Sequence, residues 1–283
     1  MAQSPFATIL EPEVLEAHLD RNDNDTVIVQ VCSTERFLEG HIPGAQHLPP
    51  QSLLCGTPPL TALPPSLTQI ADTLAHLGIR KHTHVVALDD EGGGWAGRLL
   101  WTLSMVGHEN WSLLNGGLWA WSGAKLPLVS GEEPARFEET PVQPPQALTW
   151  APQAPTVTAA QIIEHLTDPN WVIWDARSAD EYAGIRHTAQ RNGHIPGAKH
   201  YEWTRAMDRD QHLRLRPLDT IQAELAALGI TPDKTIVTHC HSHHRSGFTW
   251  VLGKILNFNA MLAYPGSWSE WGNAAETPIS TDV

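Results

Sequence analysis

The chain has 283 residues, enough for two domains of ordinary size, and its hydrophobic content of 41% argues against wholesale disorder. Its formal net charge of −13 argues against nucleic acid or an anionic membrane as the main partner. No run of about 20 apolar residues occurs, so we expect no transmembrane helix. Because three cysteines cannot all pair within one chain and no signal peptide is evident, we expect free thiols and a cytoplasmic location.

Three segments of the first half return in the second half. They recur in the same order and about 150 positions later, a spacing of the size of one domain. Chance explains three ordered coincidences poorly, so the sequence indicates a tandem duplication. The pairs are GHIPGA at 40–45 and 193–198, LGIRKHTHVVALDD from Leu77 and LGITPDKTIVTHCH from Leu228, and LNGGLWAW at 114–121 and YPGSWSEW at 264–271.

Between the two copies lies a segment with many Pro and Glu residues and no clear period, residues 124–155. Proline lacks an N–H donor and stiffens the chain, so we predict an extended linker here. The linker divides the chain into a first domain, residues 1–123, and a second domain, residues 156–283.

The second copy consists of predicted strands that alternate with predicted helices. WVIWDA at 171–176 is a short apolar run typical of a buried strand, and the helix predicted over IQAELAALGI at 221–230 ends near Gly229. TPDKTIVTHC at 231–240 predicts a turn followed by a strand, and SGFTWVLGKILNF at 246–258 has apolar residues at helical spacing. This alternation favours an α/β fold in which each copy forms a mainly parallel sheet flanked by helices.

Cys240 is expected at the end of a strand, in a short loop that enters the next helix. Ligands of open α/β sheets bind just beyond the carboxyl ends of the strands, and the N–H groups of a loop that enters a helix attract anions. A cysteine in such a place has its thiolate favoured, which lowers its pKa and makes it a nucleophile. The other candidate residues of the loop are His241, Ser242, His243, His244 and Arg245.

The duplication supplies an internal comparison for this loop. Aligning Leu77 with Leu228 places Asp89 opposite Cys240, and the first copy continues as DDEGGGWAGR, without cysteine or histidine. An aspartate cannot act as a sulfur nucleophile. We therefore predict an inactive first domain joined to a catalytic second domain.

These residues resemble those of tandem-domain rhodaneses of the bacterial type, which are thiosulfate sulfurtransferases. The resemblance rests on DARSADEY at 175–182 with the second GHIPGA, on the strand, loop and helix at 235–256, and on GSWSEW at 266–271. It implies two tandem rhodanese-like domains and no cofactor. It also implies that the Cys240 thiolate takes the outer sulfur of thiosulfate as a persulfide and passes it to cyanide or another thiophile, such as a thiol.

The resemblance also implies that Arg245 and the loop histidines attract the thiosulfate dianion. We expect Asp175 and Arg177 to form an ion pair at a strand end that supports the loop. Gln30 and Cys32 occupy their places in the first copy, which fits loss of function there.

Two further arginines, Arg186 and Arg191, lie in an insertion that the first copy lacks. They are candidates for guiding an anion to the site, and a solvated loop is an equally good interpretation. Glu181 stands where mercaptopyruvate sulfurtransferases carry a substrate-binding arginine, which disfavours 3-mercaptopyruvate as the donor.

A zinc site, a phosphatase and a persulfide carrier are the alternatives to a sulfur-transfer enzyme. A zinc site needs ligands that converge from separate segments, whereas the histidines here lie in one tight loop, so no metal is expected. Phosphatases of the rhodanese fold have five residues between Cys and Arg, whereas four residues separate Cys240 from Arg245. A persulfide carrier that hands sulfur to a protein partner would use the same loop, so the sequence leaves that alternative open.

Overall fold

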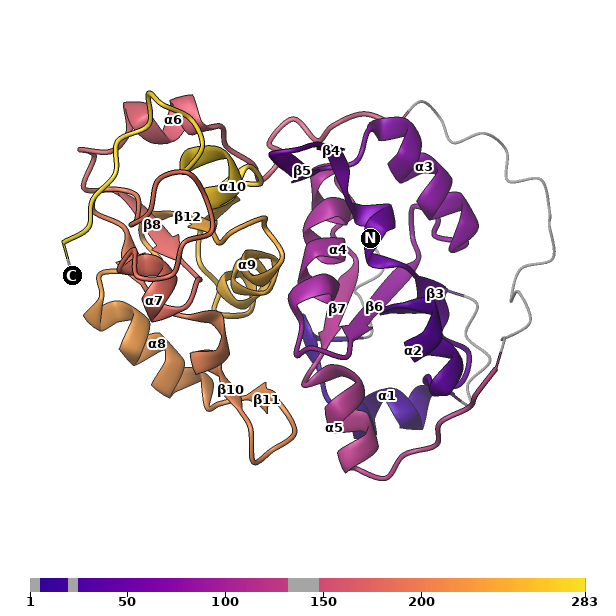
Figure 1. Cartoon of the computed structure of the whole chain (residues 1–283). Helices are drawn as coiled ribbons and strands as arrows, with labels where there is room; N and C mark the ends of the chain where they lie inside the picture. Colours follow the sequence, from indigo (N-terminus) through magenta and orange to yellow (C-terminus); the bar gives the residue numbers. More distant parts are fainter. Residues whose placement is uncertain (1–5, 20–24, 132–147, 283) are drawn as a thin grey trace. The chain divides into compact units, whose positions relative to one another are not determined.

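The computed structural model describes residues 6–19, 25–131 and 148–282, and the described residues form two compact units (Figure 1). The predicted domain boundaries stay a prediction, and residues 132–147 of the predicted linker lie outside the described residues. Counting only described residues, the first unit falls within Met1–Leu54, Pro65–Ala154 and Asp208–Arg214, and the second within Cys55–Pro64, Pro155–Met207 and Leu215–Val283.

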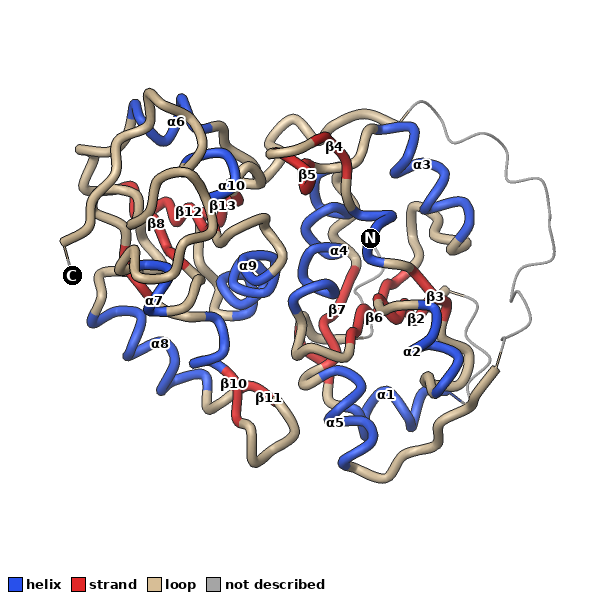
Figure 2. Tube along the Cα trace, viewed as in Figure 1, coloured by secondary structure: helices blue, strands red, loops and turns tan. Residues whose placement is uncertain are grey.

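The first half of the chain forms a parallel sheet flanked by helices (Figure 2). Over the described residues this sheet has five strands in the order β1-β7-β6-β2-β3, and each neighbouring pair is parallel. Parallel neighbours need crossover connections, which the helices supply. The elements are β1 (Ile9–Leu10), α1 (Pro12–Leu19), β2 (Thr26–Val31), α2 (Thr34–Glu39), β3 (Gln46–Leu48), η1 (Pro50–Leu53), β4 (Cys55–Thr57), β5 (Leu60–Leu63), α3 (Leu67–His76), β6 (His84–Asp89), α4 (Gly94–Met105), β7 (Trp111–Leu114) and α5 (Gly117–Gly123).

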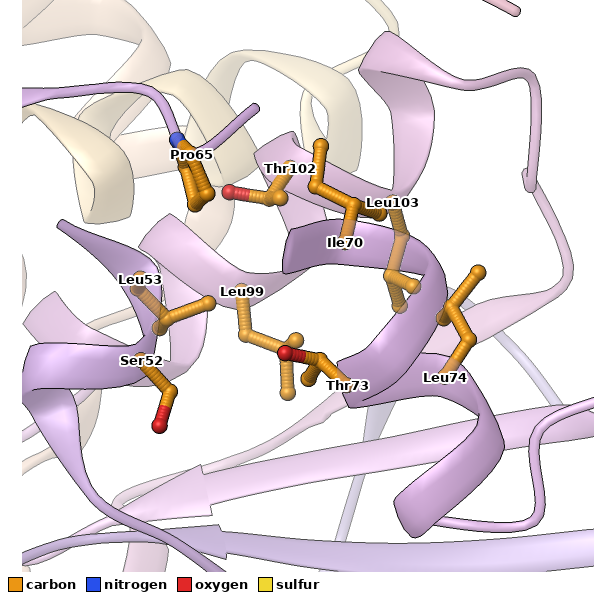
Figure 3. A pocket seen from close by; sticks show the side chains of 9 residues that line it. All are labelled: Ser52, Leu53, Pro65, Ile70, Thr73, Leu74, Leu99, Thr102 and Leu103. Atoms are coloured by element: carbon orange, nitrogen blue, oxygen red, sulfur yellow. The ribbon is translucent and has the colours of Figure 1, made fainter. Parts of the chain in front are cut away.

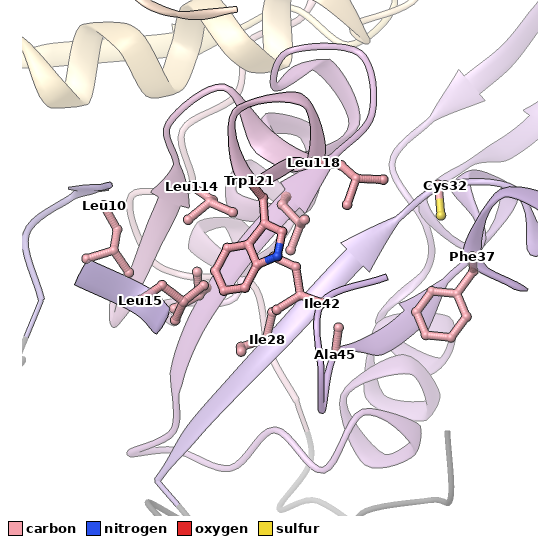
Figure 4. Close-up of a cluster of buried hydrophobic side chains, with 12 residues drawn as sticks. Leu10, Leu15, Ile28, Cys32, Phe37, Ile42, Ala45, Leu114, Leu118 and Trp121 are labelled. Atoms are coloured by element: carbon pink, nitrogen blue, oxygen red, sulfur yellow. The ribbon is translucent and has the colours of Figure 1, made fainter. Parts of the chain in front are cut away.

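One face of this sheet packs an apolar core against the surrounding helices (Figure 4). Trp121 of α5 is fully buried there and contributes the largest side chain of the cluster. Its indole Nε1 donates to the carbonyl of Pro127 at 2.7 Å, which satisfies the polar atom of an otherwise apolar ring. The core thus holds α5 and the segment that follows it against β6 and β2.

The second half repeats this arrangement. Over the described residues its sheet has four parallel strands in the order β13-β12-β8-β9, which corresponds to β7-β6-β2-β3 of the first half. The predicted α/β fold with parallel sheets is therefore confirmed. The elements are α6 (Ala159–Glu164), β8 (Trp171–Asp175), α7 (Ala179–Tyr182), β9 (Lys199–His200), η2 (Trp203–Ala206), β10 (Met207–Asp208), β11 (Arg214–Leu215), α8 (Leu218–Ala227), β12 (Thr235–His239), α9 (Arg245–Ile255), β13 (Ala260–Ala263) and α10 (Ser267–Trp271).

The elements predicted around Cys240 are present with small shifts at their ends. Strand β12 ends at His239, and α9 begins at Arg245, one residue before the predicted start. Helix α8 begins at Leu218, three residues before the apolar pattern, and Gly229 follows it with a φ of 79°, the left-handed conformation that ends many helices. Cys240 therefore sits between a strand and a helix, as the sequence predicts.

A fully buried polar cluster lies where β8 and β12 end. The strand register places Asp175 beside His239, and Asp175 also pairs with Arg177, whose Nη2 is 2.6 Å from Oδ2. The same Nη2 donates to the carbonyl of Gly193 at 2.8 Å, and the guanidinium lies 4.3 Å from the ring centroid of Trp268. Burial opposes ionisation of Asp175, but His239 and Arg177 hold the pKa of its carboxyl at about 2.

Replacing Asp175 with asparagine (Asp175→Asn) would leave the buried Arg177 charge without its counter-ion. Removing one partner of a buried pair costs about 3–5 kcal/mol, and we expect the free energy of unfolding in urea to fall by that amount near neutral pH. The folded-state pKa is depressed, so the Asp175 contribution is present above about pH 4 and is lost as the pH falls toward about 2. Wild type should therefore lose stability more steeply than Asp175→Asn over that acidic range.

The matched control is Asp180→Asn, which neutralises an exposed carboxylate on α7. It should change the free energy of unfolding by less than about 0.5 kcal/mol. A loss below about 1 kcal/mol in Asp175→Asn would show that the fold does not depend on the buried pair.

Candidate active site

The loop of residues 240–244 surrounds the sulfur of Cys240 with hydrogen-bond donors. Cys240 is fully buried, and the Ser246 hydroxyl at the start of α9 donates to Sγ at 3.4 Å. The backbone N–H groups of Ser246 and Ser242 also hydrogen-bond to the sulfur. The donors come from Ser242 in the loop and from Ser246 in α9, so Sγ receives hydrogen bonds from two segments.

Two buried cysteines differ in how their surroundings treat a negative charge. Burial raises the pKa of a thiol, but at Cys240 the Arg245 charge and the hydrogen bonds from Ser246 and Ser242 outweigh it, so the pKa lies below its ordinary value. At Cys32 burial dominates over one weak hydrogen bond from Gln30, and the pKa rises to about 11. The surroundings of Cys240 therefore favour a thiolate, and those of Cys32 a neutral thiol.

The N-terminus of α10 turns the loop so that its N–H groups face inward. The amides of Trp268 and Ser269 donate to the carbonyls of Cys240 and His241 at 3.0 and 2.9 Å, which takes those carbonyls away from the sulfur. The hydroxyl of Ser267 accepts from the Cys240 N–H at 3.3 Å and donates to the carbonyl of Tyr264 at 2.8 Å. The GSWSEW segment thus supports the loop, a role that the sequence did not reveal.

His243 occupies the middle of the loop and is fully buried. Its backbone is left-handed, with a φ of 55°, a conformation that His, Asn and Asp adopt more often than other residues with a side chain. Its Nδ1 lies 2.8 Å from the Ser246 hydroxyl, the group that donates to Cys240. The His243 side chain is therefore connected to the sulfur through the Ser246 hydroxyl.

Arg245 forms a two-pronged ion pair with Glu181. Nη1 lies 2.6 Å from Oε2 and Nη2 lies 2.9 Å from Oε1, and the Glu181 side chain is only 4% exposed. Burial alone would raise the pKa of Glu181, but Arg245 and Ser178 lower it to about 2. The arginine that the sequence predicts to attract thiosulfate is therefore already neutralised by a carboxylate, and sequence reasoning missed this partner.

The other two loop histidines lie partly exposed. Burial lowers the pKa of His241, so its imidazole is neutral near neutral pH. The ring of His244 lies 5.8 Å from that of Trp203, and Trp203 also packs edge-on against Phe248 of α9. His244 and Trp203 therefore lie together on one side of the Cys240 loop.

The two arginines of the insertion are not brought to the loop. The guanidinium of Arg191 donates to the carbonyls of Trp271 and Thr277 at 3.0 and 2.8 Å, so it fastens the segment after α10. Arg186 is exposed beside Ile185, and its backbone N–H donates to the carbonyl of Asp180. The hydrogen bonds of the Arg191 side chain in the described part of the chain thus join it to the segment from Trp271 to Thr277 and not to Cys240.

The matching loop of the first copy holds a carboxylate where the second holds a thiol. Asp89 is fully buried at the end of β6, and its Oδ1 accepts from the N–H groups of Glu91 and Gly93 at 3.0 and 2.8 Å. Its Oδ2 accepts from the N–H of Ala96 at 3.0 Å. The two loops therefore share one backbone design, which aims amides at an anionic side chain.

Other parts of the molecule offer less chemistry. Within the described residues, no group of three or more His, Cys, Asp or Glu side chains is placed to hold a metal ion. None of the helices in the described part of the chain has the length and apolar character needed to span a membrane. Figure 3 shows a recess between η1, α3 and α4 whose lining residues carry no charge. We therefore take the Cys240 loop as the candidate active site.

Comparison with known proteins assigns the family. A thiosulfate sulfurtransferase of Azotobacter vinelandii is 43% identical over 271 residues, 96% of each chain, and one of Pseudomonas aeruginosa is 41% identical over 276 residues, 98% of each chain. The sulfur carrier protein TtuD of Thermus thermophilus is 32% identical over 255 residues, 85% of each chain. The model of the rhodanese-like domain matches residues 11–124 and again residues 158–274. The chain therefore belongs to the rhodanese-like family and carries two such domains in tandem.

Proposed function

We propose that this chain is a thiosulfate sulfurtransferase that carries the transferred sulfur as a persulfide on Cys240. The observation that supports this most directly is the buried Cys240 sulfur, whose pKa is lowered by the Arg245 charge and by hydrogen bonds from Ser246 and Ser242. The names of the two relatives that are more than 40% identical to the chain agree with this activity. No metal or cofactor takes part in the steps below.

In the first half-reaction the Cys240 thiolate attacks the outer sulfur of thiosulfate. A sulfur–sulfur bond forms to Sγ, the sulfur–sulfur bond of thiosulfate breaks, and sulfite leaves with the electron pair. The negative charge then resides on the outer sulfur of the persulfide. We expect the N–H groups of the loop to stabilise that charge, as an oxyanion hole stabilises oxygen.

In the second half-reaction a thiophile such as cyanide attacks the outer sulfur. A carbon–sulfur bond forms, the bond to Sγ breaks, and the electron pair returns to Cys240 as thiolate while thiocyanate leaves. A thiol or a protein acceptor would react at the same outer sulfur. Sulfur delivery to a protein partner is the second candidate, because one relative is named a sulfur carrier protein.

The first domain is proposed to be inactive because its loop is already filled. The Asp89 carboxylate accepts from two loop amides and from the Ala96 amide of α4, and it offers no sulfur for transfer. We also propose a cytoplasmic location, since the three cysteines are free in the structure and reduced thiols are typical of that compartment.

Arg245 is proposed to act mainly by holding the loop and favouring the thiolate. Its two-pronged bond to Glu181 joins α9 to α7, and its charge is one of the causes of the lowered Cys240 pKa. Because Glu181 neutralises the guanidinium, a donor is held chiefly by loop amides. Glu181 stands where mercaptopyruvate sulfurtransferases carry a substrate-binding arginine, so 3-mercaptopyruvate is the less favoured donor.

Replacing the nucleophile tests the assignment directly. Cys240→Ser should abolish thiocyanate formation, because serine cannot form a persulfide, whereas Cys32→Ser and Cys55→Ser should retain it. Intact mass after incubation with thiosulfate should rise by about 32 Da in wild type and both control variants, and cyanide should reverse the rise. Substantial turnover by Cys240→Ser would sink the proposal.

Replacing Arg245 separates loop geometry from recruitment of the donor. Arg245→Ala leaves the buried Glu181 carboxylate unpaired, so kcat/KM for thiosulfate should fall about a hundredfold. The reaction of pre-formed persulfide with cyanide should slow as well, since the loop and the Cys240 pKa both depend on Arg245. A rise in KM alone, with the persulfide reaction unchanged, would mean instead that Arg245 attracts the donor.

Glu181→Gln is the matched variant, because glutamine keeps the capping interaction with Ser178 but carries no charge. In the Arg245→Ala background it removes the unpaired carboxylate. The double variant should therefore be more active than Arg245→Ala alone, a non-additive result expected of residues in direct contact.

A further inference from the structure

Three residues of the active-site loop form a chain of hydrogen bonds that ends on the reactive sulfur. The Ser246 hydroxyl lies 3.4 Å from the Cys240 sulfur and 2.8 Å from Nδ1 of His243. All three side chains are fully buried, so water does not compete for these hydrogen bonds at their surface. The sulfur-transfer steps described above do not use His243.

We propose that His243 is a positioning residue that makes the Ser246 hydroxyl donate to the Cys240 sulfur, by holding a proton on its own Nδ1. The inference rests on the proposed function and adds a residue that acts on Cys240 only through Ser246.

The direction of the two hydrogen bonds depends on whether Nδ1 of His243 carries a proton. A serine hydroxyl has one proton and lies here between two neighbours, a sulfur that becomes negative and an imidazole nitrogen. If Nδ1 carries a proton, His243 donates to the Ser246 oxygen and the hydroxyl proton points at the sulfur. If Nδ1 is bare, it takes the hydroxyl proton and the sulfur loses a donor. Only in the first arrangement does the Ser246 hydroxyl add to the stabilisation of a thiolate.

The backbone at His243 supplies independent support. The equivalent position in the first copy, by the alignment of Asp89 with Cys240, is Gly92, whose φ is 96°. The second copy places a histidine in the left-handed region, with a φ of 55°, a conformation that His, Asn and Asp adopt more often than other side chains. The two loops thus share one backbone shape at this position, and only the second adds an imidazole there.

The first copy lacks all three members of the chain. Asp89 stands for the cysteine, Gly92 for the histidine and Trp95 for the serine. The backbone cradle survives there, since Asp89 accepts from the loop amides. His243 and Ser246 thus occur only in the copy that has the cysteine. The first copy keeps the shape of the loop without them.

The hydrogen bond matters most when the acceptor takes the sulfur. As the acceptor binds the outer sulfur, the bond to Sγ breaks and the electron pair returns to Cys240, so negative charge develops on Sγ. A hydroxyl that already points at Sγ stabilises that charge without reorienting. No proton changes place: Nδ1 keeps its proton and Ser246 keeps its own.

Other charged or titratable groups also act on the loop and must stay constant in a test. Arg245 of α9 and Glu181 of α7 lie on one side of it, and Asp175, Arg177 and His239 lie beneath it at the strand ends. His241 is next to Cys240 in the loop. The variants below leave every one of these groups in place.

The pH dependence of alkylation of Cys240 by iodoacetamide tests the relay without requiring sulfur transfer. The parent carries Cys32→Ser and Cys55→Ser, so a single thiol reacts. Ser246→Ala removes the donor, and His243→Gly removes the side chain without backbone strain. Each should raise the pKa of the Cys240 thiol by about one unit and slow the reaction of the persulfide with cyanide about tenfold.

Two further variants decide whether His243 acts through Ser246. In the Ser246→Ala background, His243→Gly should add nothing to the shift, because the intermediate hydroxyl is gone. His243→Asn should restore the parent pKa, because asparagine tolerates the left-handed backbone and its Nδ2 takes the place of Nδ1 as a donor. The control His187→Asn changes an exposed histidine of the insertion and should behave as the parent does.

Several outcomes would overturn the relay. Additive shifts in the double variant would mean that His243 acts independently of Ser246, and a lowered Cys240 pKa in His243→Gly would mean that Nδ1 accepts the hydroxyl proton. An unchanged pKa in either single variant, with the fold intact by circular dichroism, would also refute it. If the parent forms no persulfide, the sulfurtransferase proposal fails, while the alkylation cycle still reports on the relay.

Discussion

The active site depends on the inward direction of the loop N–H groups around Cys240. Buried thiols are ordinarily neutral, as Cys32 shows with its pKa of about 11. Cys240 differs because the Arg245 charge and the hydrogen bonds from Ser246 and Ser242 act on Sγ, while α10 amides donate to the loop carbonyls. The strand β12, the helix α9 and the GSWSEW segment each contribute to that arrangement, so the parallel sheet matters to the chemistry mainly as the frame that brings their ends together.

The charges near the sulfur are arranged as closed pairs. Asp175 with Arg177 lies fully buried beneath the loop, and Glu181 with Arg245 lies beside it. Each pair balances its own charge locally, and the nearby Arg245 charge, the loop dipoles and the Ser246 hydroxyl together stabilise a negative sulfur. Breaking either pair would leave a charge in a poorly solvated place, and for that reason we expect large effects from single substitutions and smaller ones from paired substitutions.

Local patterns in the sequence predicted the strands and helices that hold the site. They did not predict side-chain contacts between residues that are far apart in the chain. The repeated segments and the apolar periods predicted both parallel sheets and the position of Cys240 between β12 and α9. The Glu181 partner of Arg245 lies 64 positions away, and side-chain pairing at that distance leaves no period to detect. Arg191 was a candidate for guiding anions, but its guanidinium donates to the carbonyls of Trp271 and Thr277. An arginine in an insertion binds whichever backbone groups the fold brings to it.

The duplicated loop separates what the backbone supplies from what the side chain supplies. In both copies amides at the end of a strand point at an anionic group, and in the first copy the Asp89 carboxylate meets them permanently. In the second copy the negative charge moves: it sits on Sγ before thiosulfate reacts, on the outer sulfur of the persulfide afterwards, and on Sγ again when the acceptor leaves. A fixed carboxylate needs only fixed amides. A negative charge that moves between Sγ and the outer sulfur is stabilised further by an additional donor that points at Sγ. In the catalytic copy alone, Ser246 and His243 occupy the position of that donor.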